Sequence, residues 1–275
     1  MKDLLVFLDG TETDEARIVQ AESIADRHNS FLTGLFCNSL PEIMFASEAG
    51  MASLDMVSQM QDLSRAEGDA KASALAARFG RLSVHSEIRR FDVYSSQMGP
   101  TLTNEAHTAD LFIATRPYGL YNSHCEALEH VLFNSGRACL FLTPDGECCS
   151  FDTVVLAWRN SREAARAVSE ALPILTAAKK VIVAMVTEDG APETEGVMPG
   201  ADISRYLTRH GATIELQALT GWSRVGEAVL DQVEKAKADL LVMGGYGHSR
   251  FREWVLGGAT RDVLTQAEVP VLIAH

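Results

Sequence analysis

The sequence lacks the features of a membrane, secreted or nucleic-acid-binding protein. It has no apolar run near the ~18 residues of a membrane span, and Met1–Asp9 is too short and too often interrupted by aspartate for a signal peptide. Its five cysteines are odd in number and form no C-x-x-C pair, which favours reduced thiols. Basic residues are scarce, 24 against 37 acidic ones, and the resulting charge of −13 repels nucleic acid and anionic membranes. We therefore expect a cytoplasmic protein that binds neither nucleic acid nor a membrane.

Several well-known catalytic motifs are also missing. The sequence contains no G-x-x-x-x-G-K-[ST] phosphate loop, no G-x-S-x-G nucleophile turn and no H-E-x-x-H zinc helix. The compact run His124-Cys125-Glu126 invites a metal site, but consecutive residues do not converge easily on one ion and no complementary ligand pair accompanies them. We therefore expect no metal site of the protein's own and identify no catalytic residue, which leaves open whether the protein is an enzyme.

What the chain does contain is a globular composition and an internal repeat. Its 275 residues are 47% apolar and 22% charged, which is typical of one large or two ordinary domains. Strand-like runs in the first half recur in the same order in the second: 4–8 at 154–158, 109–114 at 238–243, and 140–142 at 271–273. The spacing between copies falls from about 150 to about 130 residues, which indicates a duplication with about 20 extra residues in the first half.

The extra residues fall in the Met- and Ala-rich stretch between Pro41 and Gly80. A longer helix is the simplest interpretation, and a methionine-lined groove for a partner is the alternative.

Strands alternate with helices within each half, most clearly in the second. There, a capping box at Asn160–Glu163 begins a helix, and a buried stripe follows it. Such alternation predicts a parallel sheet with helices on both faces. We expect an α/β protein of two tandem units, each a five-stranded parallel sheet, over residues 1–146 and 151–275. The stretch from Phe141 to Phe151 is interpreted as the linker.

The most informative stretch is a glycine-rich loop near the C-terminus. The apolar run 240–243 stops at Gly244-Gly245-Tyr246-Gly247, and after a basic segment a second glycine pair precedes a helix. A strand, a glycine loop and a helix N-terminus favour phosphate, although a tight strand-to-helix connection would have the same pattern. The predicted binding residues are Gly244, Gly247, His248, Ser249, Arg250, Gly257, Gly258, Ala259 and Thr260.

The spacing Gly244-x2-Gly247-x9-Gly257 resembles the glycine signature of the universal stress protein family, in which Ser or Thr follows the last glycine. The final strand, 269–275, is also similar to that family's last strand. The resemblance implies a tandem family member whose ligand is an adenine nucleotide, ATP or AMP. It places that ligand between the first strand and the glycine-loop strand of a unit, beyond their carboxyl ends. Gly258 stands where nucleotide-binding members have a hydroxyl, which Thr260 could supply.

The two halves divide the remaining features of the pattern. The first half ends its first strand in Asp9-Gly10-Thr11, as nucleotide-binding members do, but has no glycine loop. Asp9 could therefore contact an adenosine or serve only as a cap of the following helix. The second half has the loop, but Arg159 replaces the aspartate. Arg159 could bind a phosphate or lie in solvent, and Tyr246 could stack on a base or cover the loop.

Other residues of the loop are also open to two interpretations. His248 and Arg250 could hold phosphate or belong to a basic loop without a ligand, whereas Phe251 and Trp254 are interpreted as core anchors.

The final strands of both halves, 138–142 and 269–274, are apolar sheet edges, which are a liability when exposed. We expect the halves to pack through them as an internal pseudo-dimer, and a homodimer of the whole chain is also possible. The leading functional hypothesis is a stress-response regulator that binds an adenine nucleotide in its second half and has a protein partner that the sequence does not name. The alternatives are an interaction scaffold without nucleotide and an adenine-nucleotide hydrolase of the same fold.

Overall fold

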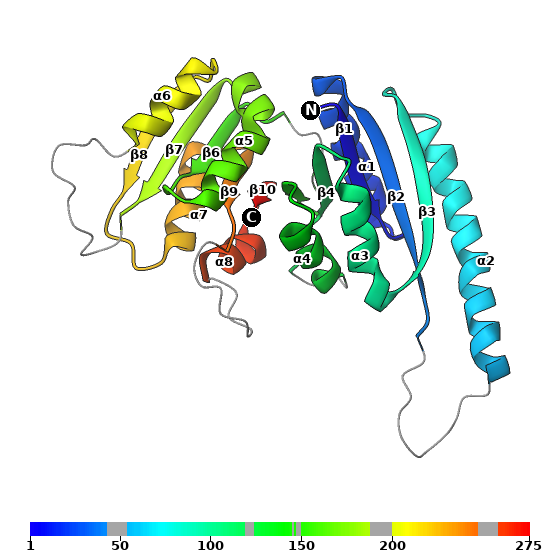
Figure 1. Cartoon of the computed structure of the whole chain (residues 1–275). Helices are drawn as coiled ribbons and strands as arrows, with labels where there is room; N and C mark the ends of the chain where they lie inside the picture. Colours follow the sequence, from blue (N-terminus) through cyan, green and yellow to red (C-terminus); the bar gives the residue numbers. More distant parts are fainter. Residues whose placement is uncertain (43–53, 119–123, 145, 147–149, 188–199, 247–257) are drawn as a thin grey trace.

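Ten strands form one continuous sheet in the computed structural model of the chain (Figure 1). The strand order is β3-β2-β1-β4-β5-β10-β9-β6-β7-β8. The structure describes residues 1–42, 54–118, 124–144, 146, 150–187, 200–246 and 258–275.

The first half of the chain forms one end of this sheet. Its strands β2, β1 and β4 pair in parallel around β1, and the outermost strand is β3. The elements in chain order are β1 (Asp3–Leu8), α1 (Thr13–His28), β2 (Phe31–Leu40), α2 (Leu54–Phe79), β3 (Ser86–Tyr94), α3 (Ser95–Ala106), β4 (Leu111–Thr115), α4 (Cys125–Asn134) and β5 (Cys139–Leu142). The 26-residue α2 confirms that the extra length of this half holds a long helix.

The second half repeats this arrangement around β6, which lies between β7 and β9. Its elements are β6 (Thr153–Ala157), α5 (Arg162–Ala177), β7 (Lys180–Val186), α6 (Ala201–Arg209), β8 (Ile214–Leu219), α7 (Val225–Ala236), β9 (Leu240–Gly244), α8 (Gly258–Gln266) and β10 (Val271–Ala274). The predicted fold class, two parallel five-stranded units, is confirmed.

The two halves join through their last strands, as their apolar edges predict. β5 and β10 pair antiparallel, with Leu140 opposite Leu272 and Phe141 opposite Val271. All four side chains are fully buried or nearly so. Because this is the one antiparallel pairing in the sheet order, each half remains a parallel unit and the two are related as the halves of a dimer would be.

Helices cover both faces of the sheet, so inner strands such as β4, β5 and β10 are buried on both sides, whereas the outer strands β3 and β8 are partly exposed. Apolar residues of α1, α2, α5 and α6 pack on one face, and those of α3, α4, α7 and α8 pack on the other. All five residues of β4 are buried, which explains why its sequence is apolar throughout and does not alternate between apolar and polar residues.

Two local expectations need correction. The predicted linker begins too early, because Phe141 and Leu142 are buried residues of β5. The cap of α5 is Ser161, one residue later than a box starting at Asn160, and its side chain accepts a hydrogen bond from the amide of Ala164 at 3.3 Å. The first turn of α5 still gains the side-chain acceptor that such helix starts require.

Candidate functional site

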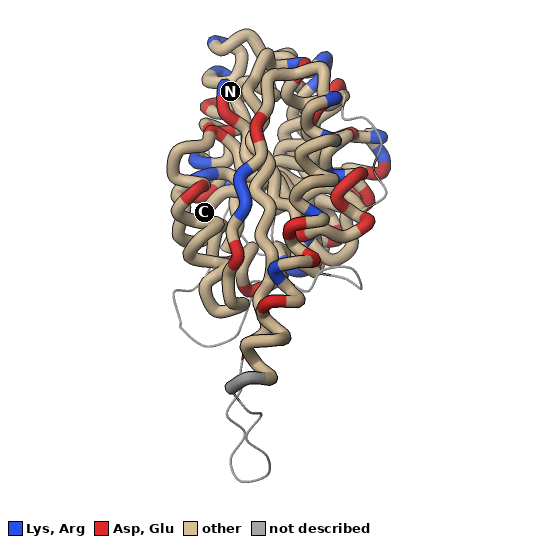
Figure 2. Tube along the Cα trace, turned by 90° about the vertical axis from the view of Figure 1, so that its right-hand side faces the viewer, with Lys and Arg blue, Asp and Glu red and all other residues tan. Residues whose placement is uncertain are grey.

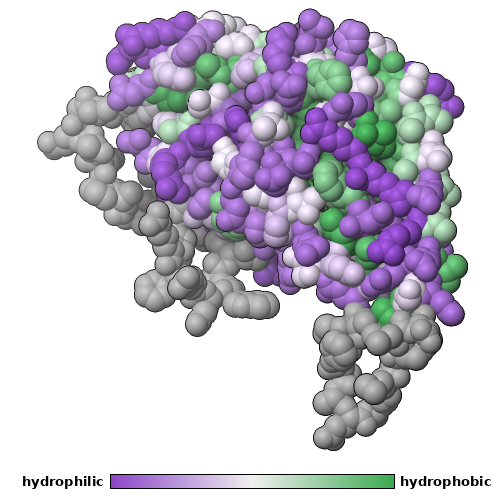
Figure 3. All heavy atoms as spheres, turned by 45° about the vertical axis from the view of Figure 1, so that its right-hand side comes forward, coloured by the Kyte–Doolittle hydropathy of each residue, from purple (hydrophilic) through white to green (hydrophobic). Residues whose placement is uncertain are grey.

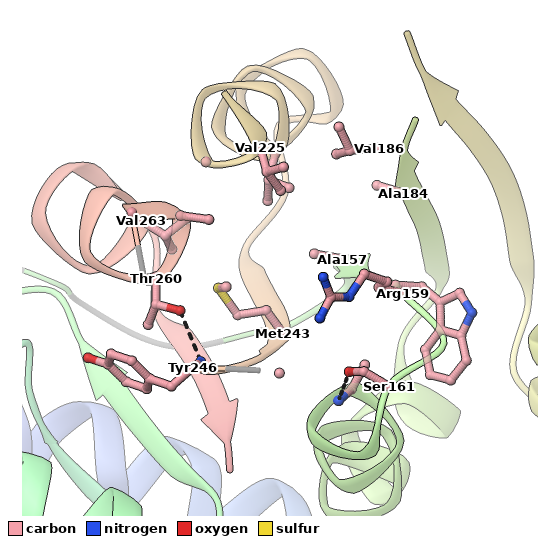
Figure 4. A pocket seen from close by; sticks show the side chains of 17 residues that line it. Ala157, Arg159, Ser161, Ala184, Val186, Val225, Met243, Tyr246, Thr260 and Val263 are labelled. Atoms are coloured by element: carbon pink, nitrogen blue, oxygen red, sulfur yellow. Dashed lines mark hydrogen bonds between the residues drawn. The ribbon is translucent and has the colours of Figure 1, made fainter. Parts of the chain in front are cut away.

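A pocket opens in the second half beyond the carboxyl ends of β6 and β9 (Figure 4). The chain runs outward from β6 to β7 and β8 on one side and places β9 and β10 on the other. Loops diverge at such a reversal of strand order and leave a crevice between them. The pocket therefore lies where the resemblance of the glycine pattern places a ligand.

One wall of the pocket is apolar. It is built by residues at the ends of β6, β7 and β9 and on the facing sides of α7 and α8: Ala157, Ala184, Val186, Val225, Val229, Met243 and Val263. These side chains offer contact surface without hydrogen-bonding groups, as the walls of cofactor sites commonly do. This wall could not be predicted separately, because apolar residues at strand ends have the same pattern as core residues.

The opposite side of the pocket is formed by the start of α8. Gly258, Ala259 and Thr260 all line it. A Cβ added to Gly258 would meet no atom of the described residues within 4 Å. A helix start presents unpaired amide groups and the positive end of the helix dipole, both of which favour an anion. These three predicted residues do lie together at the pocket.

Thr260 also fixes the shape of the loop. It is 4% exposed, and its Oγ1 accepts a hydrogen bond from the amide of Tyr246 at 3.3 Å (Figure 4). A hydroxyl that accepts one hydrogen bond can still donate its own hydrogen. Thr260 thus links the end of β9 to the first turn of α8 and keeps a donor at the pocket.

Arg159 is the one charged side chain among the described residues that line the pocket. It follows β6 directly, and its guanidinium is directed into the pocket, between Ala157 and Ser161 (Figure 4). No described lining residue is acidic. The pocket is therefore electropositive in a chain whose overall charge is −13, which would favour a ligand that carries negative charge.

Gly244, another predicted binding residue, also lines the pocket, and it has a packing role as well. A Cβ at this position would lie 2.4 Å from the amide nitrogen of Ala164 and 2.6 Å from the carbonyl carbon of Glu163. Both atoms belong to the backbone of the first turn of α5, which cannot shift cheaply. A side chain larger than that of glycine would therefore disturb the close approach of β9 and α5.

Five of the predicted binding residues lie outside the described part of the chain: Gly247, His248, Ser249, Arg250 and Gly257. Phe251 and Trp254, interpreted as core anchors, lie outside it as well. Their placement at the pocket stays a prediction.

Tyr246 contacts the first half of the chain. Its hydroxyl lies 3.3 Å from that of Tyr118, which donates a hydrogen bond to Glu129 on α4. Its ring packs against Phe133, with ring centres 4.7 Å apart. Its φ is +57°, a conformation that is strained for a bulky residue and persists only where surrounding contacts hold it. The first half therefore helps to fix the loop beside the second-half pocket.

These contacts leave Tyr246 and Tyr118 as neutral phenols. Burial raises the pKa of Tyr246 to about 12. Burial and the hydrogen bond to Glu129 raise the pKa of Tyr118 far above its ordinary value. Both side chains act as hydrogen-bonding groups and not as anions at neutral pH.

The corresponding place in the first half is filled by an ion cluster. Arg17, whose side chain is 3% exposed, contacts Asp9 at 2.6 Å and Asp14 at 2.5 Å. The spacing of about 150 residues between the first strands aligns Asp14 and Arg17 with Ala164 and Ala167 of α5. Small side chains thus leave space in the second half where the first half has charged ones.

The predicted capping role of Asp9 is wrong. Its carboxylate accepts hydrogen bonds from Thr11 and Arg17, whereas Asp14 accepts those from the amides of Asp9 and Gly10. Burial alone would raise the pKa of Asp9, but hydrogen bonding to His124 and the charge of Arg17 hold it well below its usual range. Burial raises the pKa of Asp14 to about 6, against the opposing charge of Arg17.

Within the described residues, no group of three or more His, Cys, Asp or Glu side chains could hold a metal ion. None of the helices described is both long and apolar enough to cross a membrane.

The fold and this site together define an α/β protein with a pocket at the point where strand order reverses. Comparison with known proteins identifies the family of its second half. The model of the Universal stress protein family matches residues 150–275. Residues 150–275, the second half of the chain, are therefore a universal stress protein domain.

Individual relatives agree with this assignment. A universal stress protein of Synechocystis is 38% identical over 68 residues, which cover 25% of this chain but only 23% of that protein. A universal stress protein from Archaeoglobus fulgidus DSM 4304 has a similar structure, with a TM-score of 0.71 at 17% identity over 98% of this chain and 97% of its own. A putative universal stress protein from Pseudomonas aeruginosa UCBPP-PA14 has a TM-score of 0.61 at 15% identity, covering 100% of this chain and 93% of its own. At these identities the two structures show that the fold extends over the first half too.

Proposed function

We propose that the second-half pocket binds an adenine nucleotide and that the protein is a stress-response regulator controlled by that ligand. The observation that carries this proposal is the pocket itself. It joins an apolar wall, suited to a base, to a helix start and an arginine, both suited to phosphate. The choice of adenine rests on the resemblance of the glycine pattern to nucleotide-binding members of the family.

The architecture supports one nucleotide per chain. The first half has Arg17 and Asp14 where the second half has Ala167 and Ala164, and Ala164 lines the open pocket. A phosphate brought to the first-half position would meet Asp9 and Asp14. In the second half it would meet Arg159 and no acidic lining residue.

Isothermal titration calorimetry with ATP, ADP and AMP, each with magnesium, tests the proposal. We expect binding of one nucleotide per chain, weakened by about 1–3 kcal/mol in Arg159→Ala because a charge-assisted hydrogen bond is lost. Arg162→Ala is the matched control, since Arg162 is 65% exposed, pairs with Glu163 and does not line the pocket. The control should bind as the unmodified protein does.

Two other outcomes would change the assignment. No heat of binding at millimolar nucleotide would contradict the proposal and favour an interaction scaffold. Conversion of ATP to ADP or AMP during incubation with the protein, detected by chromatography, would favour a hydrolase of the same fold.

A further inference from the structure

The helix α2 exposes an apolar face that nothing described in the chain covers. Met56, Met60 and Leu63 are 56%, 49% and 65% exposed. Their spacing of four and three residues places them on one side of the helix. Figure 2 shows this end of α2 extending below the rest of the molecule, and Figure 3 shows apolar atoms at the surface in the region that α2 occupies.

The same spacing continues to the other end of the helix. Glu67, Ala70, Ala74 and Ala77 follow at intervals of four, three, four and three residues, and all four are exposed. Alternation of three and four is the heptad spacing of helices that pack against another helix along their length. We define the α2 stripe as Met56, Met60, Leu63, Glu67, Ala70, Ala74 and Ala77.

The stripe is not the face that attaches α2 to its own sheet. That attachment uses Gly68, Leu75 and Phe79, which are buried. A Cβ on Gly68 would meet the side chain of Asn38 on β2 at 2.5 Å, and one on Gly34 would meet the ring of Phe79 at 2.4 Å. The helix therefore has one apolar face used within the chain and a second that is available to a partner. At the outer edge of the sheet, α2 is also accessible (Figure 1).

We propose that the α2 stripe binds the α2 stripe of a second copy of this chain, with the two helices antiparallel. Large side chains occupy one end of the stripe and alanines the other. An antiparallel pair places Met60 opposite Ala77 and Leu63 opposite Ala74, so that each layer combines a large with a small side chain. A parallel pair would crowd Met60 against Met60 and leave Ala74 against Ala74, with the helices unable to approach evenly.

Charge selects the same arrangement. Glu67 is the one charged residue of the stripe. In a parallel pair it would face its own copy, and like charges at a core position are unfavourable. In the antiparallel pair Glu67 faces Ala70 of the second copy and lies next to that copy's exposed Lys71. The twofold symmetry repeats this pairing, so two Glu–Lys contacts form in each dimer.

Sedimentation at increasing protein concentration, in moderate salt to screen the net charge, tests the interface. We expect a species of twice the 29.9 kDa chain mass. Leu63→Glu should weaken self-association by roughly tenfold to a hundredfold, because burial of two leucines is lost and charge is added. Ser58→Glu is the control. It adds the same charge to an exposed position on α2 outside the stripe and should associate normally.

Disulfide trapping tests the orientation. A mixture of Leu63→Cys and Ala74→Cys chains should form a mixed disulfide between the two positions, identified by mass spectrometry of the linked peptides. Leu63→Cys alone should form none between copies at that site.

Three results would overturn the proposal. The first is a monomer at every concentration, and the second is a dimer unaffected by Leu63→Glu. The third is efficient crosslinking of Leu63→Cys to itself, which would show parallel helices. Circular dichroism of each variant checks that the fold is retained, which the exposure of both mutated side chains leads us to expect.

Discussion

The two glycines at the ends of the loop, Gly244 and Gly258, should respond in opposite ways to substitution. A methyl group at Gly244 would lie 2.4 Å from the backbone of α5, well inside contact distance. Overpacking of this kind costs about 1–3 kcal/mol. Gly244→Ala should therefore lower the melting temperature by roughly 2–12 °C, given the ~2–4 °C per kcal/mol of a domain of this size.

Gly258→Ala should leave the free energy of unfolding within about 0.5 kcal/mol, since its new methyl group meets no atom of the described part of the chain within 4 Å. Gly258→Leu should retain the fold but place a large side chain at the pocket, and nucleotide affinity should fall at least tenfold. Thermal unfolding by circular dichroism measures the first effect, and calorimetric titration of the folded proteins measures the second. A Gly244→Ala protein as stable as the original, or a Gly258→Leu protein that binds nucleotide normally, would refute this division of roles.

The first half offers three further predictions. Arg17→Met should destabilise the chain by about 3–5 kcal/mol in chemical denaturation, because Asp9 and Asp14 would lose their buried cation. Since burial raises the pKa of Asp14 to about 6, the folded state binds this proton more tightly than the unfolded state. The contribution of Asp14 to the free energy of unfolding should therefore fall as pH rises from about 4 to about 6. The difference in melting temperature between Asp14→Asn and the original protein should change over the same pH range. Tyr118→Phe should cost about 1–2 kcal/mol of stability and weaken nucleotide binding a few-fold, because the hold on Tyr246 is loosened.

Each of these predictions has its own control. Arg81→Met removes an exposed arginine near the end of α2 and should be neutral. A melting difference for Asp14→Asn that is flat across this pH range would contradict the assignment of its raised pKa. Tyr206→Phe removes a hydroxyl from a tyrosine that is 40% exposed and far along the chain from the loop. If Tyr206→Phe weakened nucleotide binding as much as Tyr118→Phe does, the contact between Tyr118 and Tyr246 would have no special role in binding.

Elements whose sequence signal is local could be predicted well. The strand β9 stops at glycines, and the apolar runs of β1 and β6 repeat in register, so both parallel units follow from pattern alone. The β5–β10 junction was also predictable, because two apolar edge strands at matching places need a partner. The long α2 followed from the extra length of the first half.

Features that depend on distance between elements could not be predicted. The glycine motif predicts Gly244 as a binding residue, but it does not reveal that α5 approaches β9 so closely that a Cβ at Gly244 would meet the backbone of α5. The cluster of Arg17 with Asp9 and Asp14 brings together residues from a strand end and a helix, and no spacing rule distinguishes it from three surface charges.

Arg159 was open to two interpretations in the sequence, because an arginine after a strand is equally compatible with solvent. The end of β6 directs it into the pocket (Figure 4). Thr260 was correctly placed at the start of α8, but its bond to Tyr246 became evident only in the folded chain.

Photoaffinity labelling with an azido-adenine nucleotide tests most directly whether the second half holds the ligand. The account predicts that labelled peptides, mapped by mass spectrometry, come from the pocket walls at the ends of β6 and β7 and the start of α7, and that excess ATP prevents the labelling. If the peptides whose labelling ATP prevents came instead from around Asp9 and Arg17, the site would lie in the first half and the account would be contradicted.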